Sequence, residues 1–436
     1  MITQNEYQER RLNLAMKLSH DSVAIIPAAH EKLRNGDAHY RFRQDSDFYY
    51  LTGYHEADAV LLITSGKESR SYLFNLPRDP QQEQWTGKRL GQDGAKQSLG
   101  VDEAYDVNKI DAMLCELLEH KRAIYYFVGR YPDWEKRIFQ AWQTVKNNIR
   151  RGISAPESFF DLSSIVGEMR LFKSDQEMVL MRKAAAISVA AHRRAMQACT
   201  KARFEYELEA ELMYEFVRGG CRSVAYDSIV ACGQNACVLH YTANDQALKP
   251  GDLVLIDAGG EFENYAADIT RTFPLNGKFS GEQRAIYELV LAAQTAGKDC
   301  IRPGCGWFEV QEAIVQILTT GLVDLGLLKG DVDTLIQMQA YKPFYMHNSG
   351  HWLGIDVHDC GQYKVNHIWR PLEVSMVLTV EPGLYISEDI KGVDPRWHGI
   401  GVRIEDDIHV TDLGYENLTA ALPTGIEDIE ALIRGG

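Results

Sequence analysis

Residues 252–260 read Asp252-Leu-Val-Leu-Ile-Asp-Ala-Gly-Gly260, and after a turn residues 267–273 read Ala267-Asp-Ile-Thr-Arg-Thr-Phe273. The apolar runs predict two strands that form a hairpin. A second hairpin is predicted from Met376-Val-Leu-Thr-Val-Glu-Pro-Gly383 and, after a loop, Gly401-Val-Arg-Ile-Glu-Asp-Asp-Ile-His-Val410. Both hairpins place carboxylates within otherwise apolar strands, which indicates a weak internal two-fold resemblance and no fixed-period repeat.

The acidic residues of these strands are Asp257, Asp268, Glu381 and Glu405. A carboxylate on a buried strand loses hydration worth about several kcal/mol, so it needs cations, hydrogen bonds or solvent. Arg271 and Arg403 are the only obvious local partners, and two guanidinium groups cannot neutralise four converging acids. A metal centre is the economical interpretation. For any one acid alone, the alternative that it ends its strand in solvent stays open.

A dense histidine segment, His347-Asn-Ser-Gly-His-Trp-Leu-Gly-Ile-Asp-Val-His358, offers a nitrogen ligand, and His351 completes the set most naturally. The segment does not fit the helical H-E-x-x-H zinc motif, because Asn348 replaces the general-base glutamate and Gly350 weakens a helix. Four carboxylates and one imidazole suit Mn²⁺ or another borderline ion, and carboxylates can bridge two ions about 3.5–4 Å apart. The sequence therefore predicts a dinuclear site that activates water for hydrolysis. An aspartic-protease loop is excluded because Asp257-Ala-Gly259 lacks the hydroxyl residue.

The composition narrows the possible partners. The chain has 436 residues, which predicts two or three domains, and a net charge of −15, which argues against nucleic acid or an anionic membrane surface. Its apolar runs are shorter than the roughly 20 residues of a membrane span. Residues 1–11 are polar without an apolar segment behind them, so we expect a cytoplasmic protein. The eight cysteines contain no C-x-x-C pair and predict neither a disulfide framework nor a zinc ribbon.

The pattern along the chain predicts two domains. Strand-like runs at 22–27, 59–64 and 71–74 and a helical period at 109–119 predict an α/β arrangement in the first third. Capping boxes at 174–177 and 280–283 predict the starts of two long helices. We place the boundary near residue 170, which gives domains 1–170 and 171–436.

At these residues the sequence resembles the metal-dependent pita-bread peptidases, and within them the aminopeptidase P family, over nearly the whole chain. The N-terminal match is carried by Ser46-Asp-Phe-Tyr-Tyr-Leu-Thr-Gly-Tyr54 and residues 59–63. The C-terminal match is carried by five motifs in the family's order, which contain the residues Asp257, Asp268, His351, Glu381 and Glu405. The resemblance implies an α/β N-terminal domain of the creatinase/aminopeptidase P type. An α+β pita-bread catalytic domain with an antiparallel sheet and flanking helices would follow it.

The resemblance also implies roles for individual residues. Two divalent ions, Mn²⁺ with Co²⁺ or Zn²⁺ as alternatives, would be held by Asp257, Asp268, His351, Glu381 and Glu405, with Asp268 and Glu405 bridging. Glu381 would manage the proton of the nucleophilic water, and His358 and His240 would assist at the substrate carbonyl. The residues implied for substrate binding are His347, Tyr385 and Arg403 at the proline subsite and Trp85, in the first domain, at the substrate's entry.

The activity implied is release of the N-terminal residue from peptides with proline in second position. The bond before proline is a tertiary amide without N–H, so shape and metal polarisation must replace a backbone donor. Three alternatives remain: a prolidase that hydrolyses Xaa-Pro dipeptides, a non-catalytic peptide-binding module of the same fold, and, preferred least, a creatinase-like amidinohydrolase. The resemblance further implies a homo-oligomer, a dimer or a tetramer built from dimers.

Overall fold

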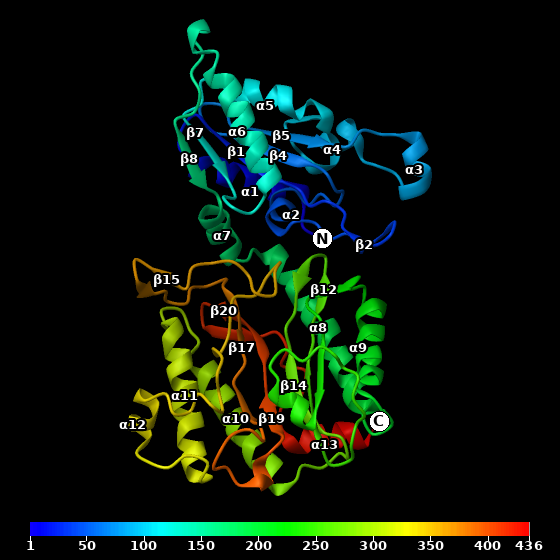
Figure 1. Cartoon of the computed structure of the whole chain (residues 1–436), viewed down its shortest axis with the longest axis vertical. Coiled ribbons are helices and arrows are strands. Elements are labelled where there is room, and N and C mark those ends of the chain that lie inside the picture. Colours follow the sequence, from blue (N-terminus) through cyan, green and yellow to red (C-terminus); the bar gives the residue numbers. More distant parts are fainter. Residues whose placement is uncertain (436) are drawn as a thin grey trace. The chain divides into compact units, whose positions relative to one another are not determined.

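The computed structural model describes residues 1–435 and divides into two compact units, Met1–Arg170 and Leu171–Gly436 (Figure 1). The described residues contain no helix that is both long enough and apolar enough to cross a bilayer.

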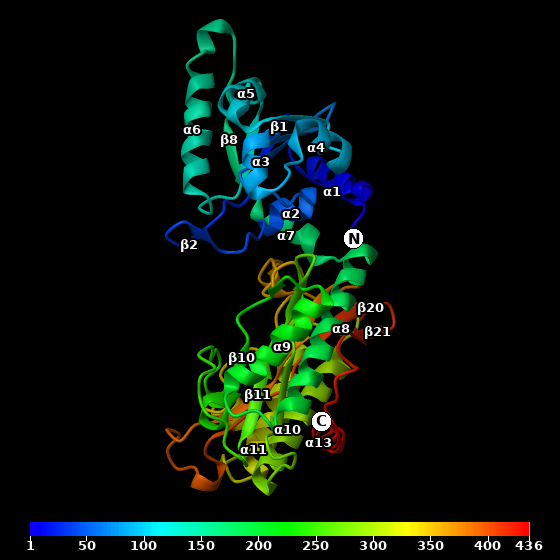
Figure 2. The same cartoon turned by 90° about the vertical axis from the view of Figure 1, so that its right-hand side faces the viewer.

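The first unit is built on a six-stranded mixed sheet in the order β6-β5-β4-β1-β7-β8. Its central strands β1 and β4 pair antiparallel, whereas β7 runs parallel to β1 and β6 runs parallel to β5. Every residue of β1 and β4 is buried, as expected for strands covered on both faces. Helices α5 and α6 pack on one face, as their shared core with β1 and β4 shows (Figure 2).

The strands of this unit are β1 (Ser22–Pro27), β2 (Leu33–Asn35), β3 (Ala38–His39), β4 (Val60–Thr64), β5 (Arg70–Asn75), β6 (Glu103–Asp106), β7 (Ala123–Tyr126) and β8 (Ser158–Asp161). Its helices are α1 (Gln4–Lys17), α2 (Ser46–Thr52), α3 (Pro80–Thr86), α4 (Gly91–Leu99), α5 (Ile110–Leu118), α6 (Pro132–Lys146) and α7 (Ser163–Leu171). The predicted strands at 22–27, 59–64 and 71–74 and the helix at 109–119 are therefore confirmed within one or two residues.

The second unit combines two helix pairs with short antiparallel strands. Helices α8 and α9 pack together, as do α10 and α11 (Figure 1). Both predicted capping boxes are present, since the hydroxyls of Ser174 and Ser280 accept from the third residue of α8 and of α10. The three-stranded sheets are β10-β11-β14, β13-β12-β9 and β17-β20-β21, and β18 pairs with β19.

The helices of the second unit are α8 (Asp175–Ala198), α9 (Glu205–Gly219), α10 (Gly281–Cys300), α11 (Trp307–Asp324), α12 (Val332–Gln337) and α13 (Ile426–Arg434). Its strands are β9 (Ser223–Val224), β10 (Ile229–Cys232), β11 (Leu253–Asp257), β12 (Gly260–Phe262), β13 (Tyr265–Ala266), β14 (Thr270–Pro274), β15 (Lys364–Val365), β16 (Ile368–Trp369), β17 (Val377–Val380), β18 (Gly383–Ile386), β19 (Ile400–Arg403), β20 (Asp406–Thr411) and β21 (Gly414–Asn417).

The structure corrects two strands of the predicted hairpins. The strand expected over 401–410 is broken at Ile404 and Glu405, because β19 pairs with β18 whereas β20 pairs with β17. The strand expected over 267–273 begins only at Thr270. The acids thus lie at strand ends and breaks instead of inside continuous strands.

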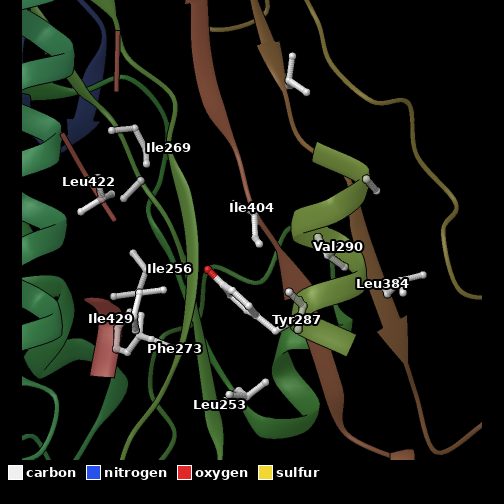
Figure 3. Packing of buried hydrophobic residues seen from close by; sticks show 14 of the residues in the cluster. Leu253, Ile256, Ile269, Phe273, Tyr287, Val290, Leu384, Ile404, Leu422 and Ile429 are labelled. Carbon is white, nitrogen blue, oxygen red and sulfur yellow. The ribbon is translucent and has the colours of Figure 1, made fainter. Parts of the chain in front are cut away.

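One apolar core joins the strands of the second unit to its helices. Figure 3 shows Ile256 of β11 and Phe273 of β14 beside Ile429 of α13, with Tyr287 and Val290 projecting from α10. All five side chains are fully buried. This packing fixes the strand ends that carry the acids.

Candidate metal centre

The four acids predicted as ligands converge at the ends of their strands. Asp257 is the last residue of β11, and Asp268 lies just before β14. Glu381 directly follows β17, and Glu405 lies in the break between β19 and β20. All four, together with His351, line one cavity of about 570 Å³, which we name the acidic cavity.

Three of these residues form the tightest group. Donor atoms of Asp268, His351 and Glu405 all lie within 4.8 Å of one another. His351 Nε2 is 3.3 Å from Asp268 Oδ2 and 3.6 Å from Glu381 Oε1. Its other nitrogen, Nδ1, lies 2.9 Å from the carbonyl oxygen of Trp352, to which it donates. That hydrogen bond leaves Nε2 as the nitrogen that faces the carboxylates and could bind a metal.

Only one of the two predicted arginine partners reaches the acids. Arg403 donates from Nη2 to Asp257 Oδ2 at 2.6 Å and from Nε to Thr270 Oγ1 at 3.2 Å. Arg271 instead donates from Nη2 to Asp406 at 2.7 Å and is fully buried there. In the described part of the chain, four buried or half-buried acids therefore share one guanidinium.

The protonation behaviour of the acids reflects this shortage of positive charge. Burial, followed by repulsion from Asp268 and Glu381, raises the pKa of Glu405 well above its usual range. Burial also raises the pKa of Glu381 to about 7, although the charge of His351 opposes this. Burial alone would lower the pKa of His351, but its hydrogen bond to Asp268 and the charge of Glu381 raise it to about 9. The protein atoms thus favour additional positive charge at this position.

The donor set fits divalent cations. Carboxylate oxygens with one imidazole suit Mn²⁺ and similar ions, and none of the described residues that line the cavity is a cysteine. The convergence of uncompensated acids is the observation that supports a metal.

The predicted histidines and tyrosine surround this group. His347 and Tyr385 are joined by a hydrogen bond of 2.8 Å between Nε2 and the hydroxyl, and that hydroxyl also accepts from Arg403 Nη1 at 2.9 Å. The ring of His358 meets the ring of His351 edge-on, with centroids 4.4 Å apart. His240, His347 and His358 all line the acidic cavity, whereas the buried Tyr385 lies behind His347.

Trp85, the remaining predicted site residue, belongs to α3 in the first unit. It is 87% exposed, and α3 has no buried residue. Its role stays a prediction.

Two contacts of the acids were missed by the sequence reasoning. The hydroxyl of Tyr226 is 2.6 Å from Asp257 Oδ1 and 2.5 Å from Asp268 Oδ1, so it is shared between them. Thr270 donates from its hydroxyl to Glu405 Oε2 at 2.6 Å. Thr270 could have been found from its place two residues after Asp268, but nothing in the irregular segment around Tyr226 signals its contact.

Comparisons with known proteins agree with a metal site at this position. The family model described as metallopeptidase family M24 matches residues 179–412, more than half of the chain. The chain belongs to metallopeptidase family M24. A second model, the aminopeptidase P N-terminal domain, matches residues 7–125 of this M24 protein. These matches confirm the predicted family and the order of its two kinds of domain.

Relatives of this M24 protein are similar to it over nearly its full length. The Xaa-Pro aminopeptidase of Escherichia coli is 46% identical over 434 residues, which are 99% of this chain and 98% of the relative. The mitochondrial intermediate cleaving peptidase 55 of Arabidopsis thaliana is 34% identical over 98% of this chain and 82% of its own.

Solved structures confirm the pita-bread fold of this M24 protein. The Pseudomonas aeruginosa aminopeptidase PepP has a TM-score of 0.97 and 50% identity, covering 100% of this chain and 98% of that one. A zinc-substituted E. coli aminopeptidase P in complex with product also has a TM-score of 0.97, at 46% identity over 100% and 99% of the two chains.

Proposed function

We propose that this protein is a metal-dependent Xaa-Pro aminopeptidase that removes the N-terminal residue from peptides with proline in second position. The convergence of four acids and His351 on one cavity, with a single guanidinium among them, carries this proposal. The full-length similarity to Xaa-Pro aminopeptidases supports the substrate class. We further infer that the two compact units are domains 1–170 and 171–436, the second of them catalytic.

The metal ligands in this proposal are Asp257, Asp268, His351, Glu381 and Glu405, which would hold two divalent cations with Asp268 and Glu405 shared. Mn²⁺ suits the oxygen-rich set best, and Co²⁺ and Zn²⁺ accept similar ligands. Such ions, when bound, polarise a carbonyl and lower the pKa of water toward neutrality.

The protein's own groups handle the proton and the substrate carbonyl. We propose that the Glu381 carboxylate accepts the proton of the attacking water and passes it to the leaving amine. His358 and His240, on the cavity wall, donate to the substrate carbonyl oxygen as it gains charge in the tetrahedral intermediate.

A proline subsite is assigned to His347, Tyr385 and Arg403. Their hydrogen bonds hold the three side chains as one rigid group beside the acids. A rigid surface suits proline, because its nitrogen in the substrate carries no N–H for a backbone acceptor to recognise. Trp85 is proposed to shape substrate access.

We propose a cytoplasmic homo-oligomer, a dimer or a tetramer, as the working form. Its negative net charge of −15 is compatible with peptide substrates and disfavours nucleic acid as a partner.

A tripeptide panel tests the activity. The purified protein, stripped of metal by a chelator and reloaded in turn with Mn²⁺, Co²⁺ or Zn²⁺, is assayed on Xaa-Pro-Yaa and on the Xaa-Pro dipeptide. We expect release of Xaa from the tripeptide, with Mn²⁺ the most effective ion. Activity confined to the dipeptide would establish the prolidase alternative, and an inert protein that takes up no ion would favour a peptide-binding module.

A further inference from the structure

Another buried carboxylate, which lies outside the acidic cavity, belongs to Glu205. Glu205, the first residue of α9, is 0% exposed. Its Oε1 atom accepts from the backbone N–H of Cys232 and from Asn235 Nδ2, each at 2.9 Å. Its Oε2 atom accepts from the Tyr241 hydroxyl at 2.7 Å and the backbone N–H of Gln246 at 3.0 Å. No lysine or arginine of the described chain forms an ion pair with Glu205, so hydrogen bonds alone compensate its charge.

All four donors belong to one stretch of chain. We name residues 233–248 the His240 loop; apart from a short 3-10 turn at Gly233–Cys237, it contains neither helix nor strand. Three of the four donors lie in this loop, and Cys232 immediately precedes it. The loop also supplies Leu239, His240 and Thr242 to the wall of the acidic cavity. Glu205 is therefore the centre of a hydrogen-bond network around the segment that presents His240.

Backbone contacts strengthen the same attachment. The N–H of Glu205 donates to the Gln246 carbonyl at 3.0 Å, and the N–H of Leu248 donates to the Arg203 carbonyl at 2.8 Å. On the other side of the loop, Asn244 accepts from the Val230 N–H at 3.0 Å and donates to the Ser228 carbonyl at 2.8 Å. The segment 241–248 is thus tied to the first residue of α9, to Arg203 just before that helix and to the start of β10, while His240 itself is exposed.

A carboxylate is the group that this network requires. Ionised acceptors make stronger hydrogen bonds than neutral ones, and the N-terminus of α9 favours a negative charge at its first residue. A glutamine at this position would keep the shape but replace one acceptor oxygen with an NH₂ donor. That donor would face either the N–H of Cys232 and the Asn235 amide or the N–H of Gln246 and the Tyr241 hydroxyl.

We propose that Glu205 is a positioning residue that holds the His240 loop, and through it the His240 ring, against the acidic cavity. This inference rests on the proposed function, in which His240 assists at the substrate carbonyl. Glu205 does not line the acidic cavity, so its effect on turnover passes through His240.

The test compares Glu205→Gln with Glu207→Gln in the full-length, metal-loaded protein. Glu207 lies in the same first helical turn, but it pairs with Arg203 at the surface, which makes it a matched control. We expect E205Q to lower kcat on an Xaa-Pro-Yaa peptide between about tenfold and about 10²-fold, because small misplacements of a catalytic group have effects of this size. Its KM and bound metal are expected to match the wild type, and E207Q is expected to behave as wild type throughout.

Two further measurements separate positioning from general stability. In a His240→Ala background, E205Q is expected to cost less than about twofold, because the group it positions is already gone. Hydrogen exchange of the Cys232 and Gln246 amides is expected to accelerate in E205Q, with α8 and α10 unchanged.

The inference is overturned if E205Q lowers kcat by the same factor in the wild-type and the His240→Ala backgrounds. Unchanged activity or unchanged hydrogen exchange in E205Q would overturn it as well. A folded, metal-loaded wild type that cleaves no Xaa-Pro-Yaa peptide would refute the proposed function instead. In that case the exchange rates alone decide whether Glu205 holds the loop.

Discussion

Arg403 and Asp257 form the ion pair that links the proposed proline subsite to the proposed metal ligands. Nη2 of Arg403 is 2.6 Å from Oδ2 of Asp257, and only 4% of the arginine side chain and 13% of the aspartate side chain are exposed. The same guanidinium donates to Tyr385 and to Thr270. One planar group therefore orients residues from three different strands.

Replacing Arg403 with lysine tests this arrangement. Lysine keeps the charge but has no planar fork, so it cannot reach Asp257, Tyr385 and Thr270 together. We expect R403K to lower kcat/KM for an Xaa-Pro-Yaa peptide by about 10²-fold, a misplacement effect. Arg284→Lys, at an exposed pair with Glu288, serves as the control. Equal activity of R403K and R284K would contradict the role given to the guanidinium.

The Tyr226 hydroxyl is expected to tune metal binding. It is shared between Asp257 and Asp268. Removing a group that hydrogen-bonds to a metal ligand commonly lowers metal affinity by roughly 10–100-fold. We expect Tyr226→Phe to weaken Mn²⁺ binding by about tenfold in competition with a chelator. Tyr206→Phe, at a tyrosine that is 48% exposed, is the control. The prediction fails if Y226F and Y206F bind Mn²⁺ equally well.

Asp268 is expected to be needed for metal uptake itself. It belongs to the tightest donor group, and an amide in its place removes a charge and an anionic oxygen. We expect Asp268→Asn to retain less than about half of the wild-type metal after dialysis and to lose activity by more than about 10²-fold. Asp227→Asn changes an exposed acid on the wall of the same cavity and is expected to keep its metal. Elemental analysis of both variants decides, and full occupancy in D268N would exclude it as a ligand.

A buried ion pair near the start of the second unit predicts a stability effect. Lys173 Nζ is 2.9 Å from Asp359 Oδ2, and each side chain is 1% exposed. Removing one partner of a buried pair costs about 3–5 kcal/mol, whereas an exposed pair contributes about 0–1 kcal/mol. We therefore expect Lys173→Met to lower Tm clearly more than Arg182→Met, which removes the exposed pair with Glu416. Similar Tm values for the two variants would show that the buried pair does not stabilise the fold.

Gly259 is expected to tolerate no side chain. A Cβ atom at this position would lie 1.7 Å from the carbonyl oxygen of Ala267, and both residues belong to the segment between Asp257 and Asp268. Backbone atoms cannot move aside cheaply, so Gly259→Ala should destabilise the protein by several kcal/mol, about the upper range for single substitutions. Gly281→Ala, where a Cβ meets nothing within 4 Å, is expected to change stability by at most about 1 kcal/mol. Thermal unfolding of the two variants checks this contrast.

Local sequence patterns predicted much of the architecture because they reflect local physics. The hydroxyls of Ser174 and Ser280 start α8 and α10 as expected, since a capping box depends on only four residues. The strand ends were less predictable. The break at Ile404 and Glu405 arises because β19 and β20 pair with different partners, which is a tertiary effect.

Charge imbalance and the dense histidine segment predict the four acids and His351, whereas the family resemblance implies the other predicted site residues. Nine of the eleven predicted site residues line the acidic cavity, and the tenth, Tyr385, lies directly behind them. Tyr226 and Glu205 could not be found in this way. Glu205 opens an amphipathic helix, where an acid normally faces solvent, and only the folded loop shows that its carboxylate is buried.

The division of the proposed ligands along the chain has a consequence for biogenesis. Asp257 and Asp268 precede α10 and α11, whereas His351, Glu381 and Glu405 follow them. A ribosome must therefore synthesise more than 130 further residues after Asp268 before the last ligand, Glu405, emerges. A nascent chain that ends before His351 holds only two of the five proposed ligands, so the proposed centre can be completed only after Glu405 has been synthesised.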